Sequence, residues 1–221
     1  MDISQYATLI FDCDGVILNS NKIKTTAFYN AALPYGEDAA EALVKYHKKH
    51  GGISRYAKFE YFLEEILGLE VELKKINNLL SVFASEIQEE LILCQISPGL
   101  EELRKNSNSN WLVVSGSYQK ELRCIFSERN LTVNFNCGIF GSPETKEVIL
   151  SREIDKGNIK FPALFIGDSK YDYQVTKATN IDFVFAYDWS EVNDWREYCD
   201  ENDLKVIKNL AQLQDSSIKA N

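Results

Sequence analysis

Short apolar runs that stop abruptly at polar residues or glycine constrain the fold of this chain more than any other feature. Such runs are typical of parallel strands that are buried on both faces and therefore lack alternation between apolar and polar residues. Helical patterns, such as those over residues 119–130 and 172–179, separate the runs. This alternation predicts an α/β fold with a doubly wound parallel sheet. The runs are residues 7–11, 111–114, 163–166 and 182–186, with a weaker one at 137–140.

The stretch between the first two runs has a different character. Long amphipathic helical patterns fill it, and it contains almost no strand signal. Glycines at Gly51-Gly52 and Gly68 separate these patterns. We therefore expect an α-helical domain over residues 19–95, inserted into a core formed by residues 1–18 and 96–221. The helical patterns cover residues 22–32, 37–47, 55–67 and 72–94.

The composition is that of an ordinary globular protein. Hydrophobic residues make up 45% and charged residues 26% of the 221 positions, which excludes collagen-like and wholly disordered classes. The formal net charge of −9 argues against broad electrostatic binding to nucleic acid or to an anionic membrane. It leaves room for a local basic pocket.

Neither the cysteines nor the start of the chain point to secretion. The five cysteines are scattered and form no Cys-x-x-Cys pair, so neither a disulfide framework nor a zinc site is indicated. The first residues lack a basic segment followed by a long apolar stretch, and no apolar run has the length of a membrane span. We expect a cytoplasmic protein. The oligomeric state cannot be predicted from these features.

Polar side chains follow three of the predicted strands where each strand ends. Asp12 and Asp14 follow the first, Ser115 follows the second, and Asp168 follows a later one. In open α/β sheets the ligand crevice lies beyond the carboxyl ends of the strands, so these side chains are expected to meet. Several carboxylates in one cleft repel each other unless a cation neutralises them, and oxygen ligands of this kind suit Mg²⁺. The sequence therefore predicts a magnesium site.

The same residues suit phosphoryl transfer. A carboxylate can attack phosphorus, while a neighbouring acid protonates the leaving oxygen and then activates water. The reaction also needs hydrogen-bond donors and positive charge around the phosphoryl oxygens. Ser115, the backbone amides that follow it and a lysine are candidates for these roles. A thiol nucleophile at Cys13 is disfavoured, because both histidines, His47 and His50, lie in the inserted segment.

With these motifs the chain resembles the haloacid dehalogenase superfamily, in particular its phosphatases with a helical cap inserted after the first strand, such as phosphoglycolate phosphatases and β-phosphoglucomutases. The resemblance implies a Rossmann-like catalytic core with residues 19–95 as the cap domain. Four motifs in the expected order carry it over nearly the whole chain: Asp12-Cys13-Asp14-Gly15-Val16, Ser115, Lys146, and Gly167-Asp168-Ser169 with Asp172.

By this resemblance Asp12 is the nucleophile and Asp14 the general acid and base. Mg²⁺ would be held by Asp12, by Asp14 through its backbone carbonyl, and by Asp168. Asp172 would support the metal, through water. It is also a candidate for the cap of a helix that begins near Tyr173, and the two roles are compatible.

The resemblance also implies a set of phosphate ligands. Ser115, Gly116 and a lysine would bind the transferring phosphoryl group. We favour Lys146 for the lysine, because residues 141–146 resemble the loop that precedes the family's lysine. Lys156 and Lys160 lie nearby in the sequence and stay open as alternatives.

A basic segment in the predicted cap has two interpretations. Residues 42–59 contain no acid but carry several lysines, an arginine and two histidines. This segment either contributes to the binding of an anionic substrate or is simply a solvated helix face. By the resemblance, a loop here selects the substrate, which makes His50, Gly51, Gly52, Arg55 and Lys58 the candidate specificity residues.

These features favour a Mg²⁺-dependent phosphatase that hydrolyses a small phosphorylated metabolite, such as a sugar phosphate or nucleotide, through an aspartyl phosphate. A phosphosugar mutase of the same family and a catalytically idle binding or regulatory protein are the alternatives. A dehalogenase is disfavoured by Asp14 and Asp168. A phosphonatase would need an imine-forming lysine in the cap, for which Lys58 is a candidate without further support.

Overall fold

The computed structural model describes residues 1–213, so the last residues of the predicted core, 214–221, lie outside the description. Within the described residues, six parallel strands form one sheet in the order β3-β2-β1-β4-β5-β6. The strands are β1 Thr8–Phe11, β2 Asn110–Tyr118, β3 Ile139–Ser142, β4 Ala163–Gly167, β5 Asp182–Ala186 and β6 Lys205–Ile207.

The strand order creates a crevice next to β1. The chain proceeds from β1 through β2 to β3 at one edge, and then returns to place β4 on the other side of β1. At such a reversal the connections leave in opposite directions and open a space beyond the carboxyl ends of the two central strands. Residues that follow β1 and β4 therefore lie side by side at this crevice.

Successive residues of the strands pack against different helical layers. Leu9 and Phe11 of β1 belong to the cluster that contains Leu103 of α5 and Phe126 of α6, whereas Ile10 belongs to a second cluster. That second cluster contains side chains of α7 and α8. Helices thus cover both faces, and the predicted doubly wound α/β fold is confirmed. These helices are α5 Leu100–Lys105, α6 Gln119–Glu128, α7 Lys146–Asp155 and α8 Lys170–Lys177.

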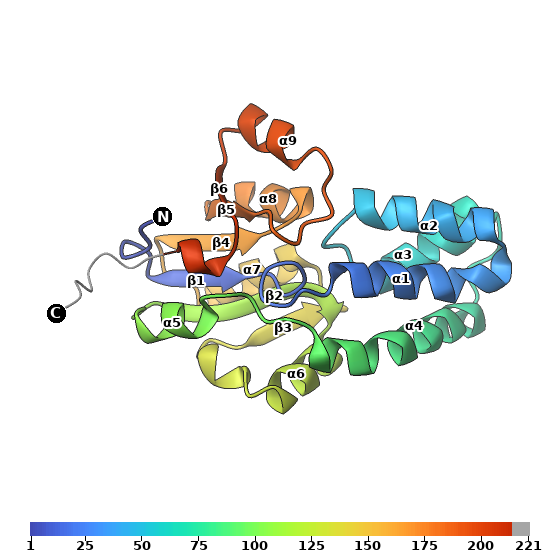
Figure 1. The fold of residues 1–221 in the computed structure, drawn as a ribbon, viewed down its shortest axis with the longest axis horizontal. Helices are drawn as coiled ribbons and strands as arrows, with labels where there is room; N and C mark the ends of the chain where they lie inside the picture. Colours follow the sequence, from blue (N-terminus) through green and yellow to red (C-terminus); the bar gives the residue numbers. More distant parts are fainter. Residues whose placement is uncertain (214–221) are drawn as a thin grey trace.

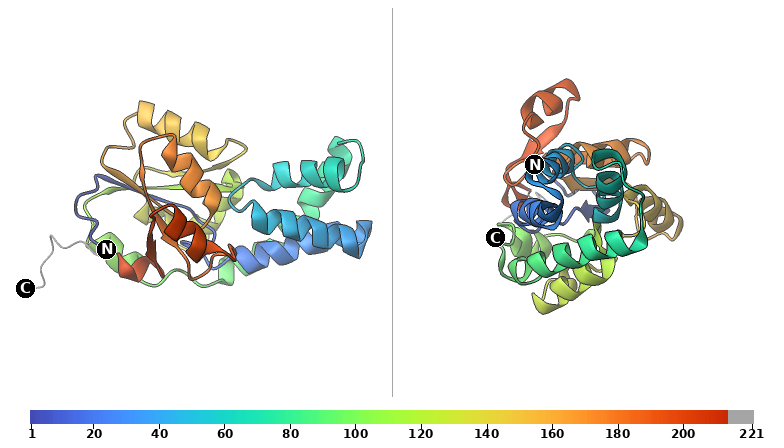
Figure 2. Two further views of the ribbon diagram at one scale, coloured as in Figure 1. Left: turned by 90° about the horizontal axis from the view of Figure 1, so that it is seen from above. Right: turned by 90° about the vertical axis from the view of Figure 1, so that its right-hand side faces the viewer.

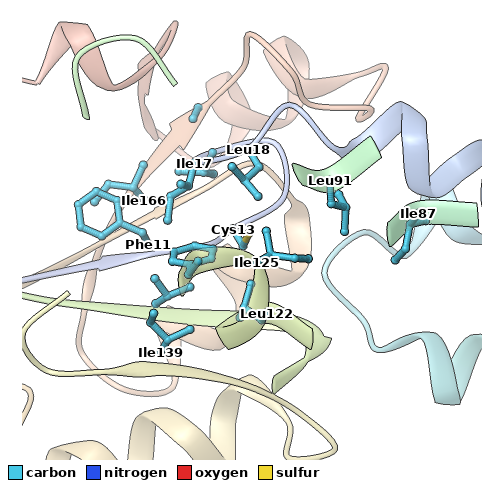
Figure 3. Close-up of a cluster of buried hydrophobic side chains, with 14 of the residues drawn as sticks. Phe11, Cys13, Ile17, Leu18, Ile87, Leu91, Leu122, Ile125, Ile139 and Ile166 are labelled. Atoms are coloured by element: carbon cyan, nitrogen blue, oxygen red, sulfur yellow. The ribbon is translucent and has the colours of Figure 1, made fainter. Parts of the chain in front are cut away.

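The chain between β1 and β2 forms a group of helices beside the end of the sheet to which β1 points (Figure 1). A hydrophobic contact joins the two parts. Figure 3 shows Ile87 and Leu91 of the last of these helices extending a row of buried side chains that continues with Leu122 and Ile125 of α6. The helices are α1 Asn21–Ala32, α2 Glu37–Lys49, α3 Arg55–Tyr61 with a π-helical turn Phe62–Ile66, and α4 Leu73–Leu93.

Several predicted boundaries need correction. β2 continues to Tyr118 instead of ending before Ser115, and α8 begins at Lys170 instead of Asp172. The sequence pattern also gave no indication of β6 or of helix α9 Trp195–Glu201, both of which lie in the red part of the chain in Figure 2. Short 3₁₀ turns complete the fold at Leu33–Tyr35, Thr132–Asn134 and Leu210–Gln212. No helix within residues 1–213 is both long and apolar enough to cross a bilayer.

Candidate active site

Asp12 follows directly after β1, at the crevice. Its backbone N–H donates to the carbonyl of Ile166 on β4 at 2.9 Å, which continues the sheet by one residue. Its carboxylate accepts a hydrogen bond from the backbone N–H of Cys13 at 2.7 Å. The residue is only 3% exposed. The backbone of two central strands therefore fixes the position of this carboxylate.

Three buried carboxylates meet at this point. Oxygens of Asp12, Asp168 and Asp172 lie within 4.8 Å of one another. The ammonium of Lys146, at the first residue of α7, lies 2.6 Å from Asp172 Oδ1 and 3.0 Å from Asp12 Oδ2. One positive charge thus faces three carboxyl groups.

The surplus of carboxylates is visible in their pKa values. Burial raises the pKa of Asp12 to about 7, with Asp172 and Asp14 adding to the effect of burial and Lys146 opposing it. Burial and the charges of Asp12 and Asp172 likewise raise the pKa of Asp168 well above its usual value. A divalent cation would offset both causes by favouring the ionised carboxylates, and an all-oxygen donor set suits Mg²⁺. The residues present therefore fit a hard metal ion.

The side chain of Asp14 does not join this cluster. Lys24 Nζ of α1 lies 2.6 Å from both of its carboxylate oxygens. Ser20 Oγ donates to Oδ1 at 2.6 Å, and Ser117 Oγ donates to Oδ2 at 2.7 Å. Burial favours the neutral carboxyl, but Lys24 and the two hydroxyls outweigh it and hold the pKa of Asp14 well below its usual range. Asp14 is thus a fixed carboxylate in this conformation.

Gly15 allows the two carboxyl-bearing loops to approach. Its backbone has φ +76°, and a Cβ at this position would lie 2.1 Å from Asp168 Oδ2 and 2.4 Å from Asn21 Nδ2. Asn21 Nδ2 in turn donates to Asp168 Oδ2 at 2.7 Å and to the carbonyl of Trp189 at 2.9 Å. Only glycine combines this backbone conformation with this close approach.

Asp172 is held by the start of α8. The N-cap residue of this helix is Ser169, and Asp172 is its third residue, so the expectation that Asp172 itself caps a helix near Tyr173 is wrong. Ser169 Oγ accepts from the backbone N–H of Asp172, and the Asp172 carboxylate accepts from the backbone N–H of Ser169. This reciprocal capping box leaves Asp172 Oδ1 for Lys146.

The predicted phosphate ligands lie at different depths. Ser115 is fully buried, and its hydroxyl accepts from the backbone N–H of Ser117 at 3.1 Å. Gly116 lies at the surface of the cavity, against the loop between α2 and α3: a Cβ on Gly116 would lie 2.2 Å from the carbonyl oxygen of Gly52. This contact brings the inserted segment down onto β2.

A cavity of about 60 Å³ lies between the carboxylates and the inserted helices. The predicted site residues Asp12, Asp14 and Asp168 line it from the core. Ser115, Lys146, Asp172 and His50 are not among its lining residues, whereas the other predicted site residues are. From the inserted segment and the loop after β5, the lining residues include Asn21, Lys24, Phe28, His47, Lys48, Gly51, Gly52, Arg55, Lys58, Phe83 and Glu191.

Arg55 and His50 differ in their surroundings although both were predicted as specificity residues. The guanidinium of Arg55 forms a two-point ion pair with Glu121 of α6 and stacks over the ring of Phe83. His50 Nδ1 lies 3.0 Å from the carbonyl of Tyr46, and the His50 ring packs on the ring of Tyr46. Arg55 therefore joins the insertion to the core at the cavity, and His50 does not line it.

Sequence reasoning missed Asn21, Lys24 and Glu191, and left the role of His47 open. For Lys24 the pattern holds no signal, because a lone lysine on a helix resembles any surface lysine. Glu191 could have been found. It lies in the loop after β5, whose carboxyl end belongs to the same edge of the sheet as the ends of β1 and β4.

Comparison with known proteins identifies a family. Residues 9–186 match the family model described as haloacid dehalogenase-like hydrolase. This match covers most of the chain and confirms the resemblance seen in the motifs. Among the curated proteins, none matches the chain.

Solved structures share the fold. A structure described as a predicted phosphoglycolate phosphatase from Haemophilus somnus has a TM-score of 0.70 at 16% identity, over 95% of this chain and 96% of that one. A β-phosphoglucomutase from Clostridium difficile has a TM-score of 0.75 at 17% identity, over 95% of this chain and 93% of that one. A structure described as a predicted phosphatase from Clostridium acetobutylicum has a TM-score of 0.69 at 17% identity, over 97% of this chain and 95% of that one. At such low identity these likenesses show the fold alone.

Proposed function

Because the chain belongs to the family of haloacid dehalogenase-like hydrolases, we propose that it is a Mg²⁺-dependent phosphatase acting on a small phosphorylated metabolite. The observation that carries this proposal is the contact of Lys146 with Asp12 and Asp172 beside Asp168. It combines a carboxylate nucleophile, a phosphate-binding cation and a set of metal ligands at the end of two neighbouring strands.

In this proposal Asp12 attacks the phosphorus of the substrate. The carboxylate lies at the cavity surface and its backbone is fixed by the sheet, so little reorganisation is needed for attack. The bond from phosphorus to the leaving oxygen breaks, and an aspartyl phosphate forms. Asp14, on the same loop, lies at the cavity surface as well; once substrate binding or opening separates it from Lys24, it takes up a proton from water and gives that proton to the leaving oxygen. Asp14 then takes a proton from water, which attacks phosphorus and frees Asp12.

Asp12, Asp168 and the backbone carbonyl of Asp14 would hold the metal, with Asp172 supporting it. The ion would neutralise the carboxylates and the phosphoryl oxygens, so that two negative groups can approach each other. Asn21 positions Asp168 by its hydrogen bond to Oδ2. Substitution of Asn21 should therefore weaken metal binding without removing a ligand.

Lys146 is proposed as the phosphate-binding lysine. It is 1% exposed and lies 3.0 Å from Asp12, where the transferring group would be. Lys156 is more than half exposed and pairs with Glu153 at the far end of α7, and Lys160 is exposed. Ser115 and the backbone amide of Gly116 complete the proposed phosphate ligands, with a hydroxyl and an N–H on the neighbouring strand β2.

We further propose that residues 19–95 are a cap domain and that residues 1–18 and 96–221 are the catalytic core. The close approach of Gly52 to Gly116 and the ion pair of Arg55 with Glu121 support a closed conformation of such a cap. Closure would exclude bulk water from an aspartyl phosphate, and opening would admit substrate and release product. The cavity of about 60 Å³ is smaller than typical ligand sites, so the closed form must open for entry.

The proposal is tested by measuring phosphate release from sugar phosphates, nucleotides and small phosphate esters with and without Mg²⁺. Release that requires Mg²⁺ supports the phosphatase. Formation of an isomer without release of phosphate would instead favour a phosphosugar mutase. Binding without any turnover would favour a regulatory protein on this fold. A cytoplasmic location stays a prediction from the sequence.

A further inference from the structure

In the described chain, Lys58 of α3 is a buried ammonium without a carboxylate partner. The residue is 2% exposed and lines the cavity. Its Nζ lies 2.8 Å from His47 Nδ1 and 5.5 Å from the centre of the Phe28 ring. Within residues 1–213, no carboxylate oxygen lies within the 4.0 Å of an ion pair. Two of its three N–H donors therefore have no hydrogen-bond partner among the described residues.

The other cations of the cavity differ from Lys58 in this respect. Each of them has a carboxylate within ion-pair distance. Lys58 alone among the lysines and arginines that line the cavity in the described chain lacks one. The pairs are Lys24 with Asp14, Lys48 with Glu191 at 3.7 Å, and Arg55 with Glu121.

His47 of α2 adds a second unfilled donor. Burial and the neighbouring Lys58 hold the pKa of His47 well below its usual value, so the ring is neutral. Because Lys58 donates to Nδ1, the single ring proton belongs on Nε2. His47 Nε2 is buried and has no hydrogen-bond partner in the part of the chain that the structure describes. The nearest carboxylate oxygen, Oε2 of Glu191, lies 3.9 Å away, beyond hydrogen-bond distance.

We propose that Lys58 and His47 form a subsite for a second anionic group on the substrate, a carboxylate or a second phosphate on the leaving portion of the phosphate ester. This inference rests on the proposed phosphatase function and narrows its substrate class to acidic phosphate esters. The leaving portion would extend from the phosphoryl group at Asp12 toward the inserted helices, where both donors line the same cavity.

An anion fits this subsite better than a hydroxyl group or a cation. As an ammonium, Lys58 offers only donors and would repel a metal ion. A hydroxyl would accept a hydrogen bond but would leave the buried positive charge without compensation, and a buried charge is costly unless it is paired. Carboxylate and phosphate oxygens satisfy the donors and the charge together, with the stronger hydrogen bonds of an ionised acceptor.

The test compares phosphate esters that differ by one anionic group. One pair is 3-phosphoglycerate and glycerol 3-phosphate, which exchanges a carboxylate for a hydroxymethyl group. The other is fructose 1,6-bisphosphate and fructose 6-phosphate, which exchanges a phosphate for a hydroxyl. We expect kcat/KM of the native protein to favour the acidic member of one pair by about tenfold or more, as for one charge-assisted contact. The pair that shows this preference identifies the anionic group.

Variants connect the preference to the subsite. Lys58→Met should lower kcat/KM for the acidic member about tenfold more than for its neutral partner. Lys45→Met removes an exposed lysine of α2 and should leave unchanged the ratio of kcat/KM for the acidic ester to kcat/KM for its neutral partner. His47→Phe keeps an aromatic ring and removes the Nε2 donor, and should reduce the ratio as well. An unchanged ratio in both Lys58→Met and His47→Phe would overturn the subsite.

Failure of the subsite is distinguishable from failure of the phosphatase proposal. If the native protein releases phosphate from none of the four esters, isothermal titration calorimetry measures their binding directly. Tighter binding of an acidic member, lost in Lys58→Met, would support the subsite although the phosphatase proposal failed. Equal binding of both members of each pair, or no binding, would contradict it. Turnover without preference for an acidic ester contradicts the subsite and leaves the phosphatase proposal standing.

Discussion

Lys24 on α1 lies 2.6 Å from the carboxylate of Asp14, so a residue of the inserted helices supplies the counter-ion of a carboxylate in the core. The relationship couples the position of α1 to the charge of the proposed general acid and base. It also means that Asp14 is ionised until substrate binding or opening separates the pair.

Replacement of Lys24 should cost stability in a pH-dependent way. Lys24→Met leaves Asp14 without its cation and should lower the free energy of unfolding by about 2 kcal/mol at pH 7, less than for fully buried pairs because Asp14 keeps some contact with solvent. The lowered pKa of Asp14 stabilises the native protein above the unfolded value of about 3.9, and this contribution is lost as the pH falls below it. The difference between native protein and variant should therefore stay nearly constant from pH 7 to about pH 4 and shrink below it.

Urea unfolding at several pH values measures this difference. Lys22→Met, which removes an exposed lysine of the same helix, is the matched control and should change the free energy of unfolding little at any pH. A difference between the native protein and Lys24→Met that does not shrink below pH 4 would contradict the pairing.

Replacement of Lys58 should raise the free energy of unfolding, whereas replacement of Lys24 should lower it. Burial lowers the pKa of Lys58 to about 7, so the folded protein binds this proton less tightly than the unfolded chain. The resulting loss of stability is fully present below pH 7 and disappears as the pH rises toward about 10.4, the pKa of a lysine in the unfolded chain. Lys58→Met should therefore have a free energy of unfolding about 1–3 kcal/mol higher than that of the native protein at pH 6.5. Urea unfolding measures this gain, which should diminish by pH 10. A variant less stable than the native protein at pH 6.5 would refute the unpaired ammonium.

Gly116 should be required for closure. A Cβ in Gly116→Ala would meet the carbonyl oxygen of Gly52, and the clash is relieved if the loop between α2 and α3 moves away. We expect kcat/KM to fall about tenfold or more while the thermal midpoint changes by only a few degrees. Steady-state kinetics and thermal unfolding measure the two effects. Unchanged kcat/KM would show that the contact of Gly116 with Gly52 has no part in turnover.

Divalent metal should stabilise the protein through Asp168. A ligand that binds only the folded state at a concentration 100 times its Kd adds about 2.7 kcal/mol to stability. Mg²⁺ should therefore raise the thermal midpoint of the native protein and raise it much less in Asp168→Asn. Asp155→Asn removes an exposed carboxylate outside the cluster and should respond like the native protein. An equal response of Asp168→Asn and native protein to Mg²⁺ would argue against the site.

The sequence predicted most of the fold because buried parallel strands leave a short-range signal. The run at residues 163–166 became β4 Ala163–Gly167, and the run at 182–186 became β5 with those bounds. Of the side chains it predicted to meet at the carboxyl ends of the strands, Asp12 and Asp168 do so, whereas the side chain of Asp14 lies apart from them. The extension of β2 to Tyr118 escaped prediction because Ser115, Gly116 and Ser117, which interrupt the apolar run, are polar or small.

Contacts between side chains of distant elements could not be predicted from the sequence. The pattern of α1 says that Lys24 lies on a helix, but only the packing of that helix against the end of the sheet brings it to Asp14. The same holds for Lys58 and His47, which come from two helices and meet on the inner side of the insertion. Pairings between distant elements depend on helix placement, which local periodicity does not encode.

The central claim is that Asp12 carries the phosphoryl group, and mass spectrometry of acid-quenched reactions tests it most directly. The native protein with Mg²⁺ and a turned-over ester should show one added phosphoryl group on the peptide that contains Asp12. Asp12→Asn should lose the adduct and about 10³-fold or more of the turnover, while Asp155→Asn keeps both. Full turnover by Asp12→Asn, or a phosphoryl group on another residue, would contradict the account.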